Sequence, residues 1–85
     1  MVLLKLDVVL REAPAHPTAH LARGQARLKT GDAGGARDDL EQQTRLAPDS
    51  AHAWLLLAEA RRALGDEEGA RQAQARGRAP TAGAR

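Results

Sequence analysis

The sequence of 85 residues contains no cysteine, phenylalanine or tyrosine, and Trp54 is its only tryptophan. Because cysteine is absent, the chain forms no disulfide, offers no thiolate nucleophile and supplies no cysteine ligand for zinc. This absence fits a reducing compartment, and we expect the protein to be cytoplasmic. A core with so few aromatic side chains must be built from leucine, valine and alanine, which suits close-packed helices better than a β-sandwich or barrel.

The sequence also has little excess of one charge over the other and no long apolar run. The formal net charge is +2, and the small excess of arginine is dispersed, so composition alone does not indicate nucleic-acid binding. The most apolar stretch, Met1 to Leu10, is interrupted by Lys5 and Asp7 and is too short to span a bilayer. We therefore expect no membrane segment and interpret this stretch as part of the fold.

One segment of the sequence occurs twice. Residues 31–37 and 65–71 both follow the pattern Gly-Asp-x-x-Gly-Ala-Arg. Their offset is 65 − 31 = 34 residues, and Pro14 and Pro48 share it. A period of this size is typical of solenoid proteins, in which each repeat is a supersecondary unit that cannot bury its apolar face alone.

Helix boundaries follow from the residues at these two corners. Gly31 is the expected left-handed terminator of one helix, and Asp32 is the expected cap of the next. Gly65 and Asp66 repeat both roles. The sequence predicts one all-α domain over residues 1–78, followed by a flexible tail over residues 79–85. Its helices are expected at about residues 1–13, 17–30, 33–46, 51–64 and 67–77.

The opening helix has apolar residues on two sides. A broad stripe contains Val2, Leu3, Leu6, Val9 and Leu10, and the opposite side contains Leu4 and Val8. A helix with two apolar sides needs two neighbours, and the sequence supplies only one. We therefore expect a homodimer, or contact with another partner, through residues 2–10. The expected self-association residues are Val2, Leu3, Leu4 and Val8.

The period resembles that of the tetratricopeptide repeat family, whose unit is an antiparallel helix pair. In that family the first helix carries an aromatic residue, Leu-Gly and Tyr, and the second carries Ala, a large apolar residue and a closing Pro. The first repeat has His20, Arg23, Gly24, Arg27, Ala36, Leu40 and Pro48 at these positions. The second repeat has Trp54, Leu57, Ala58, Arg61, Ala70 and Gln74, and the opening helix supplies half a repeat with Val2, Leu6 and Pro14. The resemblance covers residues 1–78 and implies a short right-handed α-solenoid.

Several positions depart from the family pattern. Arg23 and Arg27 replace Leu and Tyr in the first repeat, which predicts a thin core between its two helices. Gln74 replaces the large apolar anchor of the last helix. Since a buried CH₂ is worth about 0.8 kcal/mol, its loss predicts a weakly held terminal helix. Trp54 stands where the family places a packing aromatic, so we expect it in the core rather than as an anchor for a partner.

By resemblance, the first helix of each pair lines a groove that receives a partner segment. The lining positions are Thr18, Leu21, Gln25, Leu28 and Lys29 in the first repeat and His52, Leu55, Glu59 and Arg62 in the second. Leu55 supports this assignment independently, because it points away from the apolar stripe of its helix, although single exposed leucines are common. The resemblance implies a non-catalytic interaction or scaffold module.

No pattern of catalytic, cofactor-binding or metal-ligating residues stands out. His16 and His20 are four residues apart, but His16 lies in a turn, and we expect His20 to substitute for a packing aromatic. The glycines of residues 31–35 are not followed by the Gly-Lys-Ser/Thr of a phosphate loop. The acidic residues at positions 38, 39 and 41 are interpreted as a solvated helix face. We therefore expect no enzyme, no cofactor and no metal.

Two other functions remain as alternatives to a protein-interaction module. One is a basic helical module that binds nucleic acid through Arg23, Arg27, Arg37 and the C-terminal arginines, which requires these side chains to converge on one surface. Interleaved acidic residues argue against it. The other is an accessory repeat fragment of a larger enzyme or regulator.

Overall fold

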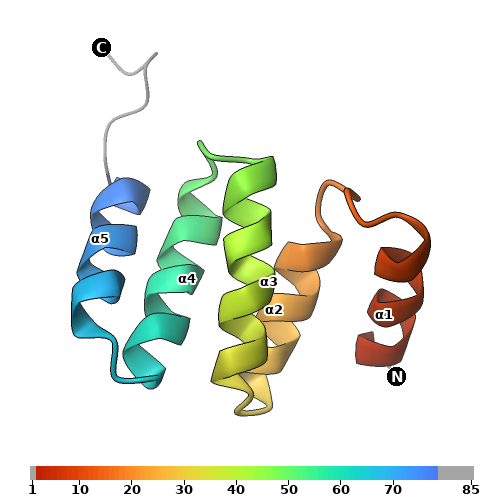
Figure 1. Ribbon diagram of the computed structural model, residues 1–85, viewed down its shortest axis with the longest axis horizontal. Helices are drawn as coiled ribbons and strands as arrows, with labels where there is room; N and C mark the ends of the chain where they lie inside the picture. The colour runs from red at the N-terminus through yellow and green to blue at the C-terminus, as the bar shows by residue number, and fades with distance from the viewer. Residues whose placement is uncertain (1, 79–85) are drawn as a thin grey trace.

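The computed structural model describes residues 2–78, which form five helices joined by short turns. The helices are α1 (Val2–Glu12), α2 (Ala19–Lys29), α3 (Ala33–Leu46), α4 (Ala51–Ala63) and α5 (Glu67–Arg78) (Figure 1). The predicted all-α fold is confirmed, and no strand occurs among these residues. The tail predicted over residues 79–85 lies outside the described part of the chain.

Consecutive helices pack side by side in a row, with α1 at one end and α5 at the other (Figure 1). α2 pairs with α3, α4 pairs with α5, and α3 joins the two pairs by packing on α4. At the beginning of the row α1 packs on α2. This neighbour-to-neighbour arrangement is that of a helical solenoid, in which each unit is stabilised by the next one.

The two corners with the repeated sequence have the same geometry. Gly31 and Gly65 adopt positive φ angles of 87° and 84°, as predicted, and they are the only residues with positive φ in the described part. Asp32 and Asp66 each accept a hydrogen bond from the backbone N–H three residues later, at 2.9 Å in both cases. Each corner therefore ends one helix with a left-handed glycine and caps the next with an aspartate.

Replacing Asp66 with alanine tests the cap of α5. The Asp66→Ala variant leaves an N-terminal N–H group of α5 without its acceptor, and we expect the free energy of unfolding to fall by about 1 kcal/mol in urea titrations. Asp32→Ala is the matched variant, and the equal geometry predicts an equal loss. Two variants as stable as the parent would contradict this role.

The apolar core lies mainly between α3, α4 and α5. Its fully buried members are Ala36, Leu40, Leu57, Ala58, Ala60, Ala70 and Ala73, against which Leu21, Leu28, Trp54 and Leu56 pack. The many alanines bring the helices close together, and Leu40 and Leu57 are the largest fully buried side chains. Trp54 is half-buried against this core, as the sequence predicts.

α2 and α3 approach closely at Gly24. A Cβ at this position would lie 2.9 Å from Cγ of Leu40 and 3.3 Å from Cβ of Asp39, closer than side-chain packing tolerates. The equivalents 34 residues later are Ala58, Gln74 and Ala73. The first pair thus combines a glycine with larger neighbours, and this close contact aligns the polar residues of α2 and α3 described next.

Candidate protein-binding surfaces

Asp39 of α3 is only 2% exposed and binds two arginines of α2. Nε and Nη2 of Arg23 donate hydrogen bonds to its two carboxylate oxygens at 2.9 and 2.7 Å, and Nη1 of Arg27 donates at 3.0 Å. The hydrogen bond to Asp39 raises the pKa of Arg23 above its ordinary value, so this guanidinium stays charged. Ion pairs therefore occupy the space where the sequence predicts a thin apolar core.

The prediction that Asp39 lies on a solvated face is wrong. Its neighbour Asp38 is exposed as expected, but Asp39 points toward α2, where two guanidinium groups compensate its charge. The same geometry bears on the nucleic-acid alternative, which relies on Arg23 and Arg27 among other arginines. These two guanidinium groups are bound to a buried carboxylate rather than directed to solvent.

The ion pairs extend from Asp39 to α1. Nη1 of Arg23 donates to Oδ1 of Asp7 at 2.7 Å, and Leu10 of α1 is buried. On the same helix Leu3 is half-buried, whereas Leu4 is 63% and Val8 is 39% exposed. One side of α1 is thus fixed on α2 by a charge pair and a leucine, and another side presents two apolar residues to solvent.

The four predicted self-association residues therefore differ in accessibility. Leu4 and Val8 are on the exposed side of α1, and Leu3 is half-buried. Val2 belongs to the first turn of α1, and its side chain lies outside the described part of the structure.

His20 and Trp54 occupy equivalent positions and make equivalent hydrogen bonds. Nε2 of His20 lies 2.9 Å from the carbonyl oxygen of Pro14, and Nε1–H of Trp54 donates to the carbonyl oxygen of Pro48 at 2.7 Å. His20 is 9% exposed, which fits the prediction that it replaces a packing aromatic. Its Nδ1 is buried without a hydrogen-bond partner, 3.5 Å from Oδ1 of Asp39. Within residues 2–78, no three metal-ligating side chains cluster.

The residues predicted to line a groove on α2 and α4 differ in their exposure and contacts. Gln25 and Lys29 border a shallow hollow of about 370 Å³ on α2, together with Ala22, Ala26 and Thr30. Leu21 and Leu28 are half-buried and pack against the core, and Thr18 precedes α2 as an exposed residue.

Of the predicted groove residues on α4, two are exposed to solvent and two lie against α5. His52 and Glu59 are exposed. Leu55 is 41% exposed, and a Cβ added to Gly77 of α5 would lie 2.8 Å from its Cδ2. The Arg62 guanidinium lies 3.4 Å from Glu67 and 3.3 Å from Gln74. This half of the predicted groove therefore lies beside α5 at the end of the row.

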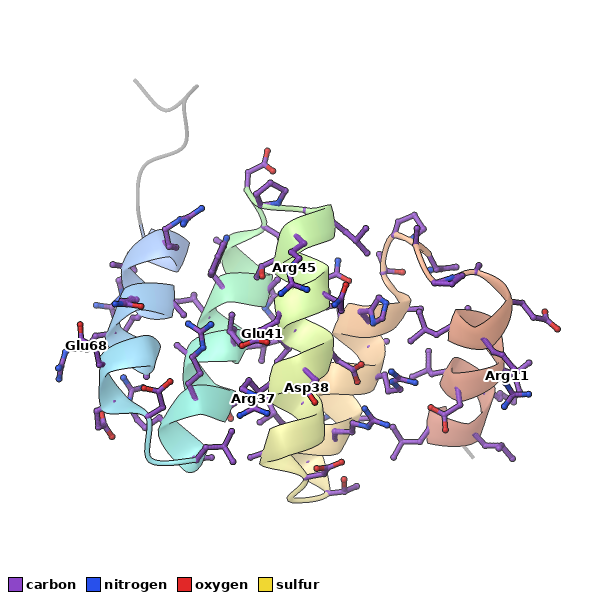
Figure 2. All side chains as sticks on the ribbon, in the orientation of Figure 1. Arg11, Arg37, Asp38, Glu41, Arg45 and Glu68 are labelled. Carbon is purple, nitrogen blue, oxygen red and sulfur yellow. The ribbon has the colours of Figure 1, made fainter. Side chains whose placement is uncertain are left out.

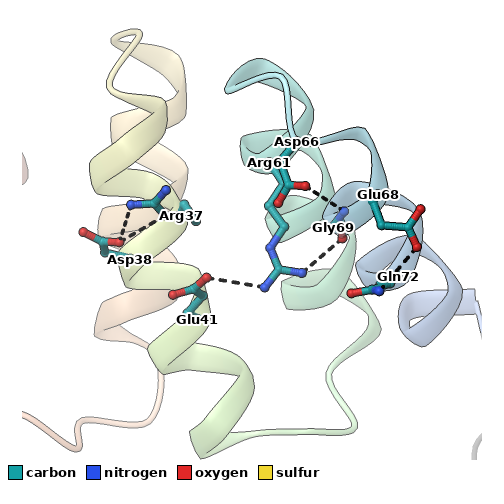
Figure 3. A pocket seen from close by; sticks show the side chains of 8 residues that line it. All are labelled: Arg37, Asp38, Glu41, Arg61, Asp66, Glu68, Gly69 and Gln72. Carbon is teal, nitrogen blue, oxygen red and sulfur yellow. Dashed lines mark hydrogen bonds and ion pairs between the residues drawn. The ribbon is translucent and has the colours of Figure 1, made fainter.

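A different groove, which sequence patterns did not indicate, runs between α3 and α5 with α4 as its floor. It consists of two hollows that share Glu41 and Arg61, and Figure 3 shows the first of them. The first has a volume of about 430 Å³ and is lined by Arg37, Asp38, Glu41, Arg61, Asp66, Glu68, Gly69 and Gln72. The second has a volume of about 360 Å³ and is lined by Glu41, Thr44, Arg45, Pro48, Trp54, Leu57, Arg61 and Arg76. We call the two together the outer groove.

Arg61 bridges the two hollows. Its Nη1 donates to the carbonyl oxygen of Gly69 at 3.0 Å, and its Nη2 lies 3.4 Å from Oε2 of Glu41. The spacing of Glu41 and Arg45 on one helix favours an ion pair between them. In the structure Glu41 instead faces Arg61 of α4, because the helix packing brings that guanidinium to it (Figure 3).

A family model described as Tetratricopeptide repeat matches the chain twice, over residues 5–50 and 21–84. These matches cover most of the sequence, and the chain belongs to the tetratricopeptide repeat family. Comparison with curated proteins and with solved structures gives no match. Repeats of this family generally mediate protein–protein interaction or scaffolding, and its members are typically non-catalytic. None of α1–α5 combines the length and the apolar character that a bilayer crossing requires.

Proposed function

We propose that this chain is a cytoplasmic, non-catalytic interaction module that pairs with a second copy of itself through α1. The observation that carries the proposal is the exposure of Leu4 and Val8, at 63% and 39%. At the opposite end of the row, α5 presents charged residues such as Glu68 and Arg71 to solvent. Solenoid ends that face water carry polar outer surfaces, so the apolar side of α1 is the end suited to a contact.

A second copy is the simplest occupant of this side. A twofold axis beside α1 would bring Leu4 and Val8 of one copy against the same residues of the other, which makes the contact self-complementary. Two copies of a single short helix bury less than the area of about 800 Å² per partner that stable dimers need. We therefore expect weak, concentration-dependent pairing.

The face of α2 and α4 is the proposed site for a peptide segment of another protein. Gln25 and Lys29 border its hollow, and exposed His52 and Glu59 extend it along α4. This proposal concerns a surface separate from α1, so pairing through α1 would leave it accessible.

Light scattering coupled to size-exclusion chromatography tests the pairing. We expect the parent chain to show a concentration-dependent mass between monomer and dimer, and a Leu4→Glu/Val8→Glu variant to stay monomeric, because charges on both copies would then face each other. Leu46 and Leu64 are 43% and 44% exposed elsewhere, so Leu46→Glu/Leu64→Glu is the matched control and should keep the parent behaviour. A parent chain that is monomeric at high micromolar concentration would contradict the proposal. So would a Leu4→Glu/Val8→Glu variant with the same mass as the parent.

A further inference from the structure

The outer groove divides its charges by sign along its length. Four carboxylates and two guanidinium groups line the first hollow. The second hollow is lined by three guanidinium groups, from Arg45, Arg61 and Arg76, and by the single carboxylate of Glu41. The groove is therefore net negative at one end and net positive at the other.

The charges of the first hollow are largely paired. Nε and Nη2 of Arg37 donate to Oδ1 of Asp38 at 3.2 and 3.0 Å, and Arg71 beside the hollow donates to Glu68 at 2.8 Å. Oδ1 of Asp66 accepts the capping hydrogen bond of α5. With Arg71 included, four carboxylates face three guanidinium groups, so this end keeps an excess of one negative charge.

The second hollow has two arginines without a carboxylate. Within residues 2–78, Arg45 makes no hydrogen bond and no ion pair with another side chain. The guanidinium of Arg76 lies over the ring of Trp54, with Cζ 4.4 Å from the ring centroid. A guanidinium held by an aromatic face keeps its N–H donors directed outward, and these donors fit carboxylate oxygens.

The two ends are separated by a distance that a short peptide spans. Asp38 and Arg45 lie along α3 on the side that Figure 2 shows, seven residues apart. At 1.5 Å per residue this corresponds to about 10 Å. Three residues of an extended chain, at about 3.3 Å each, or two turns of a helix cover the same distance.

We propose that the outer groove docks a segment of another protein that carries carboxylates at one end and basic side chains about 10 Å away. The carboxylates bind between Arg45 and Arg76 beside the aromatic wall of Trp54, and the basic side chains bind near Asp38 and Glu68. A small anion would bind in the second hollow alone. A segment that carries both charges also binds the carboxylates of the first hollow through its basic side chains. This surface is distinct from the apolar side of α1 and from the hollow on α2.

Peptide binding measured by fluorescence anisotropy tests this assignment. The probe is a labelled peptide of about ten residues in which two adjacent glutamates and two adjacent lysines are separated by two uncharged residues, with uncharged residues at both ends. The nearest glutamate and lysine are then about 10 Å apart in an extended chain. The control peptide has the same composition with the charges alternating. We expect the separated arrangement to bind about fivefold more tightly at low salt, and the difference to shrink as salt screens the charges.

Charge-reversal variants of the groove provide the second part of the experiment. Arg45→Glu/Arg76→Glu removes two attractive charge pairs and puts like charges in their place, so it should weaken binding of the separated peptide about tenfold. Lys5→Glu/Arg11→Glu makes the same change in net charge on exposed residues of α1, outside the groove, and should alter binding less than about twofold. If loss of the contact with Trp54 unfolds the double variant, Arg45→Glu alone provides the test, with a smaller loss.

Several results would overturn the proposal. Equal binding of the two peptides would remove the role of charge separation, and equal losses in the two variants would indicate general electrostatic attraction. Full competition by acetate at the same concentration of carboxylate would assign the site to small anions. A changed mass of Arg45→Glu/Arg76→Glu would assign the groove to a second copy of the chain. Leu4→Glu/Val8→Glu should bind the separated peptide normally, so failure of pairing through α1 and failure of this site are separate outcomes.

Discussion

Replacing Asp39 with alanine should lower the free energy of unfolding by about 3 kcal/mol, because two guanidinium groups then lose the carboxylate that compensates them. This is the lower end of the range for breaking a buried ion pair. The loss lies at this end because the side chains of Arg23 and Arg27 are 19% and 25% exposed and keep some contact with water. Small domains have about 5–15 kcal/mol in total, so Asp39→Ala approaches the stability limit. Urea titration followed by circular dichroism measures the change.

The second repeat supplies the control for this prediction. Its equivalents of Arg23 and Asp39 are Leu57 and Ala73, both buried in the apolar core. We therefore expect Arg23→Leu/Asp39→Ala to recover part of the stability that Asp39→Ala loses, since a buried ion pair is often replaceable by apolar residues. Recovery is partial because Arg27 still lacks the carboxylate of Asp39. A double variant as unstable as the single one would show that the energetic role assigned to the ion pairs is mistaken.

Leu57→Ala should lower the free energy of unfolding by about 2–5 kcal/mol. Leu57 is 1% exposed and is one of the two largest fully buried side chains. Truncation leaves a cavity whose neighbours are mostly alanines. Their side chains are too short to fill it. A variant that has lost its helical signal without denaturant also agrees with this expectation.

Leu55 provides the comparison on the same helix. It is 41% exposed, so Leu55→Ala removes far less apolar surface from contact and should cost less than about 1 kcal/mol. Similar losses in Leu55→Ala and Leu57→Ala would mean that burial in this core is not what decides stability.

The architecture could be predicted from sequence because its signals are local and repeated. Gly31 and Gly65 need positive φ, which only glycine adopts readily, and Asp32 and Asp66 serve as caps within one helical turn. The offset of 34 residues then places each corner at the same point of a helix pair. None of these features depends on knowing which distant residues meet.

The ion pairs around Asp39 and the outer groove could not be predicted in the same way. Three nearby positions, 38, 39 and 41, are all acidic, and only their place around the helix decides which one faces α2. A comparison of the repeats holds a partial signal: Leu57 and Ala73 become Arg23 and Asp39, so two apolar positions change together to opposite charges. The outer groove depends on side chains from three helices and has no pattern within any one of them.

Within residues 2–78, each helix packs on its neighbours along the row, and the one further contact is between α2 and α4. Among the helices that the structure describes, α1 packs only on α2, so the first helix can detach while the remaining helices keep their packing. Such local opening requires less free energy than global unfolding. The attachment of α1 to α2 includes the ion pair between Asp7 and Arg23, so added salt weakens this attachment by screening the pair. The apolar contribution of buried Leu10 is largely insensitive to salt.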